Sequence, residues 1–119
     1  MWSHFYDFQK RFLMSNYQDY EVLRLKKLRS YKDVFHKTKI IIRKIDPGSR
    51  IIFFGSVLRG DYNACSDIDL IVIPSDSSLR DKITVAVWKK IDAPIELHII
   101  SNTQFEEWYL RFIDKYQEL

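Results

Sequence analysis

The chain has 119 residues, of which 46% are hydrophobic and 29% are charged, with only three glycines and three prolines. This length suits one folded domain, and the composition excludes a disordered, collagen-like or linker-dominated chain. No apolar run approaches the ~20 residues that a membrane span needs, and charged residues interrupt the stretch where a secretory signal would lie. The single cysteine excludes an internal disulfide and a cysteine-based zinc site, so we expect a cytoplasmic protein.

The net charge is +3, but the charges are distributed unevenly. Residues 22–44 hold nine basic residues and one acidic residue, whereas residues 45–119 carry a net charge of −4. Such a basic stripe has three interpretations: a solvated helix face whose lysine stems cover apolar surface, a surface for a protein or nucleotide, or a surface for extended nucleic acid. We prefer the first interpretation and regard nucleic acid as the weakest.

Two helices are expected before the first strand. The first is expected over residues 3–17, where apolar side chains recur at helical spacing and Ser3 is a candidate cap. Its apolar residues are Phe5, Phe8, Phe12 and Leu13. The second is a long helix over residues 19–45, with one apolar stripe and most basic residues on the other side, and Pro47-Gly48 ends it.

Three short apolar runs then predict the strands of a sheet covered by helices. The expected elements are a strand at 50–54, a short helix at 57–61, a strand at 67–73, a helix from Asp76 or Ser77 to Lys90, a strand at 95–100, and a last helix that begins at Ser101 or Asn102. The last helix is expected to use Phe105, Trp108, Tyr109, Phe112 and Ile113 as its apolar face. We therefore expect one domain, with a helical extension over 1–46, a core over 50–100 and a C-terminal helix over 101–119.

Two neighbouring motifs carry the chemistry: residues 54–60 read FGSVLRG and residues 66–70 read SDIDL. Strand alternation puts Asp67 and Asp69 on one face. Two carboxylates held side by side repel each other, and a divalent cation between them would relieve that repulsion. Hard oxygen ligands of this kind suit Mg²⁺ or Mn²⁺, which also bind phosphates.

The first motif has the residues of a phosphate-binding turn. Gly55 and Ser56 lie where a strand becomes a helix, so backbone N–H groups and a hydroxyl can approach an anion. Arg59 lies one turn further and is a second candidate for binding phosphate, or else it pairs with Asp61. Ser66 is a candidate nucleotide contact, or else it seats the loop before the first aspartate. These residues, with the aspartate pair, predict a site for a nucleoside triphosphate.

A third acidic residue is expected near the pair. Glu96 lies within an apolar strand, on the same face as His98, where a carboxylate is costly without a partner. If this strand lies beside the one that carries Asp69, then Asp67, Asp69 and Glu96 can hold two metal ions. One ion would bind the triphosphate and the other would lower the pKa of an attacking hydroxyl. The alternatives are a salt-bridged Glu96 and a His98 that only packs within the sheet.

The two motifs resemble those of the nucleotidyltransferase superfamily related to DNA polymerase beta, and in particular the minimal nucleotidyltransferases of prokaryotes. The family pattern of an apolar residue, Gly and Gly or Ser, then about ten residues, then Asp-apolar-Asp-apolar, matches residues 54–56 and 67–70. The resemblance implies an α/β (α+β) fold with a small mixed sheet flanked by helices. It also implies Mg²⁺-dependent transfer of a nucleoside monophosphate from an NTP. Asp67, Asp69 and Glu96 would be the metal ligands, although the third acid of the family is often Asp.

The resemblance also suggests a partner. Many minimal members pair with a small helical protein of the HEPN kind, in a toxin–antitoxin system where the transferase adenylylates a tyrosine of the toxin. The chain has no second domain to grip an acceptor, so a protein acceptor or a homo-oligomer is expected. The alternative is a catalytically weak or inactive binding module that neutralises a helical partner or binds a nucleotide.

Overall fold

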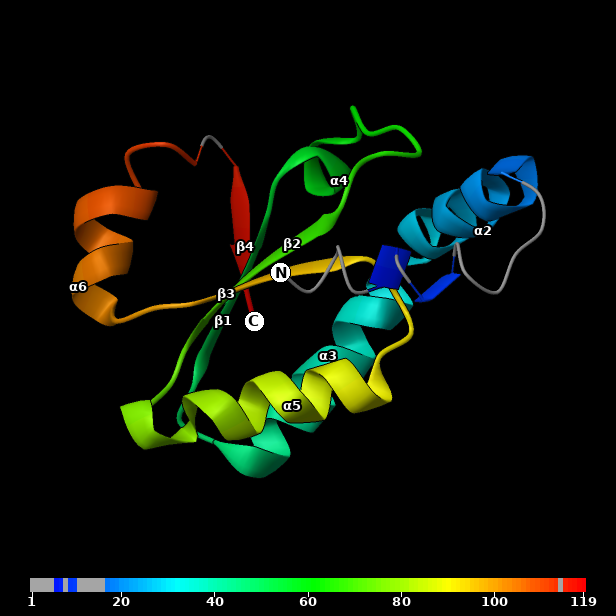
Figure 1. Cartoon of the computed structure of the whole chain (residues 1–119). Helices are drawn as coiled ribbons and strands as arrows, with labels where there is room; N and C mark the ends of the chain where they lie inside the picture. The colour runs from blue at the N-terminus through cyan, green and yellow to red at the C-terminus, as the bar shows by residue number, and fades with distance from the viewer. Residues whose placement is uncertain (1–5, 8, 11–16, 114) are drawn as a thin grey trace.

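The computed structural model describes residues 6–7, 9–10, 17–113 and 115–119, and Figure 1 shows the path of the chain. Most of the first predicted helix lies outside the described residues. The predicted features that lie outside them are the cap Ser3 and the apolar residues Phe5, Phe8, Phe12 and Leu13. No helix in the described part of the chain is both long and apolar enough to cross a membrane.

Two helices precede the sheet, α2 (Tyr17–Arg29) and α3 (Tyr31–Ile45). The prediction of one uninterrupted helix over residues 19–45 is wrong, because the chain turns at Ser30. The Ser30 hydroxyl donates to backbone carbonyls in the last turn of α2, including that of Lys26 at 3.0 Å. Serine side chains compete in this way with the regular helical pattern.

Four strands form one mixed sheet in the order β3-β2-β1-β4. The strands are β1 (Arg50–Phe54), β2 (Ile68–Ile73), β3 (Ile95–Ile99) and β4 (Tyr116–Glu118). Strand β1 is antiparallel to β2 and to β4, whereas β2 and β3 are parallel. The three predicted strands are confirmed to within one residue at each end, and the mixed sheet is confirmed.

Helical elements lie between the strands where the sequence predicts them, although the first spans residues 56–59 and not the predicted 57–61. They are α4 (Ser56–Arg59), the 3₁₀ turn η1 (Ser77–Leu79), α5 (Arg80–Lys90), α6 (Asn102–Gln104) and the π-helical turn η2 (Phe105–Tyr109). Asp76 caps η1 by accepting from the Ser78 amide at 2.9 Å. Ser101 and Gln104 form a reciprocal capping box at the start of α6.

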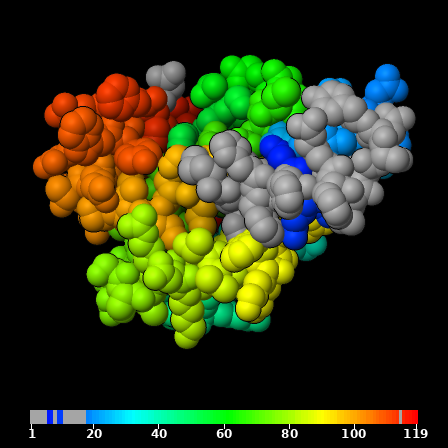
Figure 2. Space-filling model, in the orientation of Figure 1, coloured from blue at the N-terminus to red at the C-terminus, as the bar shows by residue number. Residues whose placement is uncertain are grey.

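The prediction of a helix throughout residues 101–119 is wrong in its second half. The helical segment ends at Tyr109, and residues 116–118 instead form β4 along the free edge of β1. The π-helical turn departs from the 3.6-residue period on which the predicted apolar face depends. Trp108 in this turn and Phe112 beyond it are 62% and 78% exposed, so neither belongs to the predicted buried face. Figure 2 shows this C-terminal segment, in orange to red, gathered at one side of the molecule.

The alternating strand residues face two apolar cores. The larger core lies between one face of the sheet and helices α3 and α5, which pack together on that side (Figure 1). Its centre is Phe53, whose ring contacts those of Tyr31 and Phe35. On the other face, Ile52 and Phe105 belong to a smaller core under α6 and η2. The acidic residues lie on this second face.

Candidate functional site

The register of the sheet brings the predicted acidic residues together. Phe54 of β1 pairs with Asp69 of β2, and Asp69 pairs with Glu96 of β3. Residues that pair directly across strands point to the same face, so the two carboxylates are neighbours. Asp67 comes two residues before Asp69 and shares this face by strand alternation. The expectation that Glu96 lies beside the aspartate pair is confirmed.

The glycine-serine bend lies directly against this acidic group. Gly55 has φ +92°, and a Cβ atom on it would lie 2.1 Å from Oδ2 of Asp69. Only glycine fits at this position, for both backbone and steric reasons. Helix α4 begins at the next residue, Ser56. The predicted phosphate-binding turn and the predicted metal ligand are therefore in van der Waals contact.

The acidic group accumulates negative charge. Burial and the carboxylates of Asp67 and Glu96 raise the pKa of Asp69 to about 7, against a lowering effect of Arg59. Burial also raises the pKa of Asp67, although its hydrogen bond from Arg24 opposes the rise. Carboxylates that hold one another's pKa above the ordinary value gain from a cation placed among them.

Arg24 of α2 is a residue of the site that the sequence interpretation missed. Its guanidinium donates from Nη2 to Oδ1 of Asp67 at 2.7 Å, and from Nη1 to the backbone carbonyls of Ala64, at 2.8 Å, and Ser66. The Arg24 side chain is only 4% exposed. The interpretation of residues 22–44 as a solvated basic face is therefore wrong at this position.

A signal for Arg24 was present in the sequence. Arg24 lies four residues before the fully buried Leu28, so helical periodicity places it on the apolar side of its helix. A basic residue on that side needs a buried acidic partner. Spacing alone does not say which acid is the partner, because Asp67 lies 43 residues further along the chain.

The remaining candidates for nucleotide binding lie around the bend. Arg59 forms the alternative ion pair, with Nε 3.3 Å from Oδ2 of Asp61, and both side chains are exposed. Such exposed pairs are weak, so Arg59 can exchange its partner for a phosphate. The Ser66 hydroxyl accepts from the Asn63 amide at 3.0 Å and so seats the loop that leads to Asp67. Nucleotide binding by Ser56, Arg59 and Ser66 stays a prediction.

His98 packs within the sheet, which was the alternative to a catalytic role in the sequence analysis. Its ring lies between those of Phe54 and Tyr109, with centroids 5.9 and 5.8 Å away. Burial lowers the pKa of His98, while Glu96 acts in the opposite direction. A neutral imidazole is therefore packed among aromatic rings in the middle of the sheet face.

The donor chemistry of the site fits a divalent cation. Asp67 and Asp69 supply hard oxygen donors, and burial together with the neighbouring carboxylates raises the pKa of Asp69, so a cation placed beside it would favour the ionised form. No group of three His, Cys, Asp or Glu side chains among the described residues is placed to hold one metal ion together. The fit therefore depends on the aspartate pair, and Glu96 as a third ligand stays a prediction.

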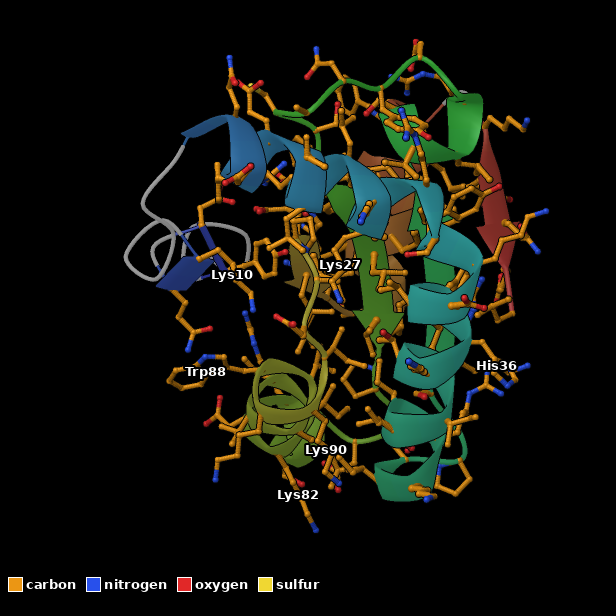
Figure 3. All side chains as sticks on the ribbon, turned by 90° about the vertical axis from the view of Figure 1, so that its right-hand side faces the viewer. Lys10, Lys27, His36, Lys82, Trp88 and Lys90 are labelled. Carbon is orange, nitrogen blue, oxygen red and sulfur yellow. The ribbon has the colours of Figure 1, made fainter. Side chains whose placement is uncertain are left out.

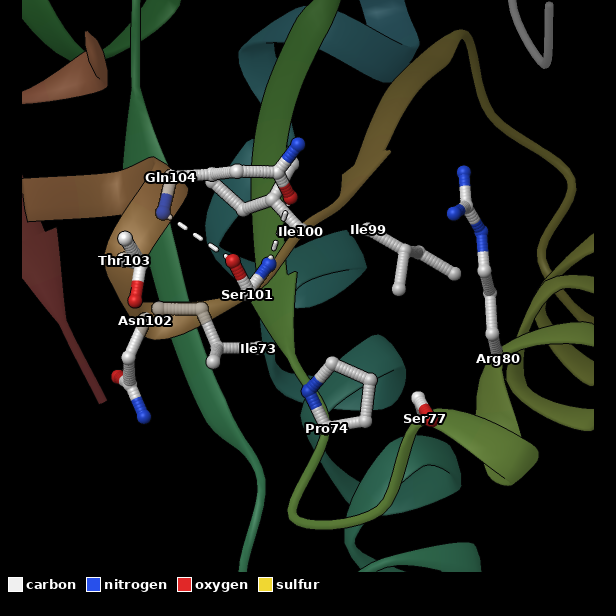
Figure 4. Close-up of a pocket in the computed structure, with 10 residues that line it drawn as sticks. All are labelled: Ile73, Pro74, Ser77, Arg80, Ile99, Ile100, Ser101, Asn102, Thr103 and Gln104. Carbon is white, nitrogen blue, oxygen red and sulfur yellow. Dashed lines mark hydrogen bonds between the residues drawn. The ribbon is translucent and has the colours of Figure 1, made fainter. Parts of the chain in front are cut away.

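A separate pocket of about 440 Å³, drawn in Figure 4, lies where the parallel strands β2 and β3 end. Ile73 and Ile99, the last residues of β2 and β3, line it together with Arg80. Asp69 lies four residues before Ile73, and Glu96 lies three residues before Ile99, so the acidic residues are roughly 10–13 Å away by strand length. This pocket therefore does not belong to the acidic site.

Comparison with known proteins finds a family that fits the motifs. A family model described as a nucleotidyltransferase domain matches residues 36–117, which is more than half of the chain. Among solved structures, a candidate nucleotidyltransferase from Sulfolobus solfataricus is similar over 88% of this chain and 89% of that one, with 16% identity and a TM-score of 0.48. A search of curated protein sequences finds no match. On the strength of the family match, the chain belongs to the nucleotidyltransferase domain family.

Proposed function

We propose that this protein transfers AMP from ATP to a hydroxyl group of another protein, in the cytoplasm and with the help of Mg²⁺ or Mn²⁺. The observation that carries the proposal is the contact between Gly55 and the Asp69 carboxylate. It joins the candidate phosphate-binding turn to a candidate metal ligand, with Glu96 on the neighbouring strand. Nucleotidyl transfer needs mainly positioning and charge neutralisation, and this arrangement supplies the groups for both.

Each residue then has a defined role. Asp67 and Asp69 would hold the cation, and Glu96 is the candidate third ligand. The chemistry that a bound Mg²⁺ or Mn²⁺ supplies is neutralisation of the triphosphate and a lower pKa of the attacking hydroxyl. Ser56 and the adjacent amides of α4 would bind phosphate oxygens through N–H and O–H donors. Arg59 would leave Asp61 and add positive charge near the transferred group.

A protein acceptor is the preferred substrate class. The FGSVLRG and SDIDL motifs resemble those of minimal nucleotidyltransferases, many of which act on a small helical partner of the HEPN kind. We therefore propose that the acceptor is a tyrosine hydroxyl of such a partner, and that the protein works as its antitoxin. Trp108 and Phe112 offer exposed aromatic surface of the kind that protein interfaces use.

Labelled nucleotides test the proposal. The protein is incubated with a candidate helical partner, Mg²⁺ or Mn²⁺, and ATP labelled on either the α- or the γ-phosphate. Label from the α-phosphate alone should appear on the partner, because nucleotidyl transfer releases the β- and γ-phosphates. Asp69→Asn should reduce labelling at least 100-fold. Asp81→Asn is the matched control, because Asp81 is an exposed acid in the first turn of α5, outside the acidic group.

The second candidate is a binding module that neutralises its partner without catalysis. It is favoured by the finding that three carboxylates are not placed around one metal position in the described structure. The double variant Asp67→Ala/Asp69→Ala separates the two functions. The binding module is the correct function if the double variant transfers no label from α-labelled ATP and still neutralises the partner as well as the wild type does.

A further inference from the structure

We infer that Arg24 is a positioning residue for Asp67. Helix α2 packs beside the acidic site, and Arg24 binds Oδ1 of Asp67 while Oδ2 stays available to the Mg²⁺ or Mn²⁺ of the proposed function. Metal binding at Asp67 rests on the proposed function, whereas the hydrogen bonds of Arg24 to the loop do not. Arg24 also lies outside residues 36–117, the part of the chain that the family model matches.

The geometry of Arg24 is that of a clamp on the loop before β2. Its guanidinium reaches the carbonyls of Ala64 and Ser66 and Oδ1 of Asp67. Three acceptors within four residues are thus held by one rigid planar group. In the described part of the chain, Oδ2 of Asp67 accepts no hydrogen bond. Arg24 therefore limits the rotation of the carboxylate and leaves its other oxygen without a donor from the described residues.

Arg24 is itself held in place from its other side. Its Nε donates to Oδ1 of Asp7 at 2.7 Å, and its Nη2 lies 3.3 Å from Oδ2 of the same carboxylate. The Tyr20 hydroxyl donates to Asp7 as well. A buried guanidinium with both of its sides paired is costly to reorient, because any other rotamer leaves donors and carboxylates unpaired.

The same helix reaches the loop before β3. Lys27 of α2 lies 3.7 Å from one carboxylate oxygen of Asp92, and Lys10 lies 2.9 Å from the other. Asp92 precedes Glu96 by four residues. Figure 3 labels Lys10 and Lys27, which lie on neighbouring segments at this side of the molecule. Asp92 is exposed and the two lysines are half-buried, so these contacts are weaker than those of Arg24. Through Arg24 and Lys27 together, α2 is attached to both loops that lead into acid-bearing strands.

The test compares two identical substitutions on one helix. Arg24→Lys keeps the charge but loses the planar fork that reaches several acceptors at once. Arg29→Lys makes the same change at an exposed position of α2. Mn²⁺ binding is measured by electron paramagnetic resonance on the whole protein without nucleotide. Residues that orient metal ligands typically contribute 10–100-fold in affinity, so Arg24→Lys should bind Mn²⁺ roughly ten times or more weakly than Arg29→Lys.

Hydrogen exchange provides a readout that needs no metal. The amides of Cys65 and Ser66 bond to Asn63 within the clamped loop. They should exchange at least tenfold faster in Arg24→Lys than in Arg29→Lys, while the β2 amides exchange equally in both. If the wild type binds no Mn²⁺, the metal part of the proposed function fails, and this exchange comparison alone decides the positioning role.

Two results would overturn the inference: Mn²⁺ affinity of Arg24→Lys equal to that of Arg29→Lys, or equal exchange of the loop amides. Either result leaves label transfer by the wild type, and so the proposed function, untouched. If Arg24→Lys does not fold, the wild type serves instead. The side-chain Nε–H resonance of Arg24 should then shift on Mg²⁺ titration, with the same midpoint as the Asp67 amide, and an unmoved Arg24 resonance would overturn the inference.

Discussion

Replacing Gly55 with alanine tests the central contact of the site. The new Cβ would lie 2.1 Å from Oδ2, 3.0 Å from Cγ and 3.2 Å from Cβ of Asp69, so the carboxylate must move. The backbone, at φ +92° and ψ −168°, is also in a region that is essentially restricted to glycine. We expect Gly55→Ala to lower the free energy of unfolding by about 1–3 kcal/mol from backbone strain alone. With an unfolding entropy of roughly 0.25 kcal/mol/K for a chain of this length, Tm should fall by about 4–12 °C.

The steric part of this effect can be separated from the backbone part. Gly60 has φ +87° and ψ 4°, in the left-handed helical region, and a Cβ atom on it would meet nothing within 4 Å, so Gly60→Ala reports only the milder strain of that region, without a steric conflict. Thermal and urea unfolding are measured for both variants and for Gly55→Ala in an Asp69→Ala background. Gly55→Ala should cost more than Gly60→Ala, and less when Asp69 is already truncated. Equal costs for the two glycines, together with additivity with Asp69→Ala, would refute the reasoning.

Three further predictions concern the charge of Asp69, the larger core and the attachment of β4. Burial and neighbouring carboxylates raise the pKa of Asp69 to about 7. Between about pH 4 and pH 7 the folded state therefore binds more protons than the unfolded state. The stability that this group contributes falls as the pH rises through that window. Asp69→Asn should therefore unfold at higher urea concentration than the wild type at pH 8, and this advantage should vanish near pH 4. Phe53→Ala, at a fully buried position, should lower the free energy of unfolding by about 3–5 kcal/mol in urea titrations, and a loss below ~1 kcal/mol would contradict the described core. Arg50→Lys breaks a bidentate ion pair with Glu118 that joins β4 to β1. Because both side chains are partly exposed, the free energy of unfolding should fall by less than about 1 kcal/mol. Hydrogen exchange of the β4 amides should nevertheless become faster.

Local patterns in the sequence determined most of the elements and the identity of the acidic residues. The strands at residues 50–54 and 68–73 follow from short apolar runs bounded by turn residues, and the start of α6 follows from its Ser101 cap. Strand alternation likewise placed Asp67 and Asp69 on one face. Each of these inferences involves residues a few positions apart, where backbone geometry links spacing directly to position in space.

Contacts between distant parts of the chain were decided only by the tertiary structure. The pairing of Tyr116–Glu118 with β1 depends on a free strand edge, and no local pattern in a short polar segment records it. The clamp of Arg24 on Asp67 joins α2 to the loop before β2 across 43 residues. A buried ion pair of this kind depends on how a helix docks against the sheet, and one sequence records only that a basic residue occupies an apolar position.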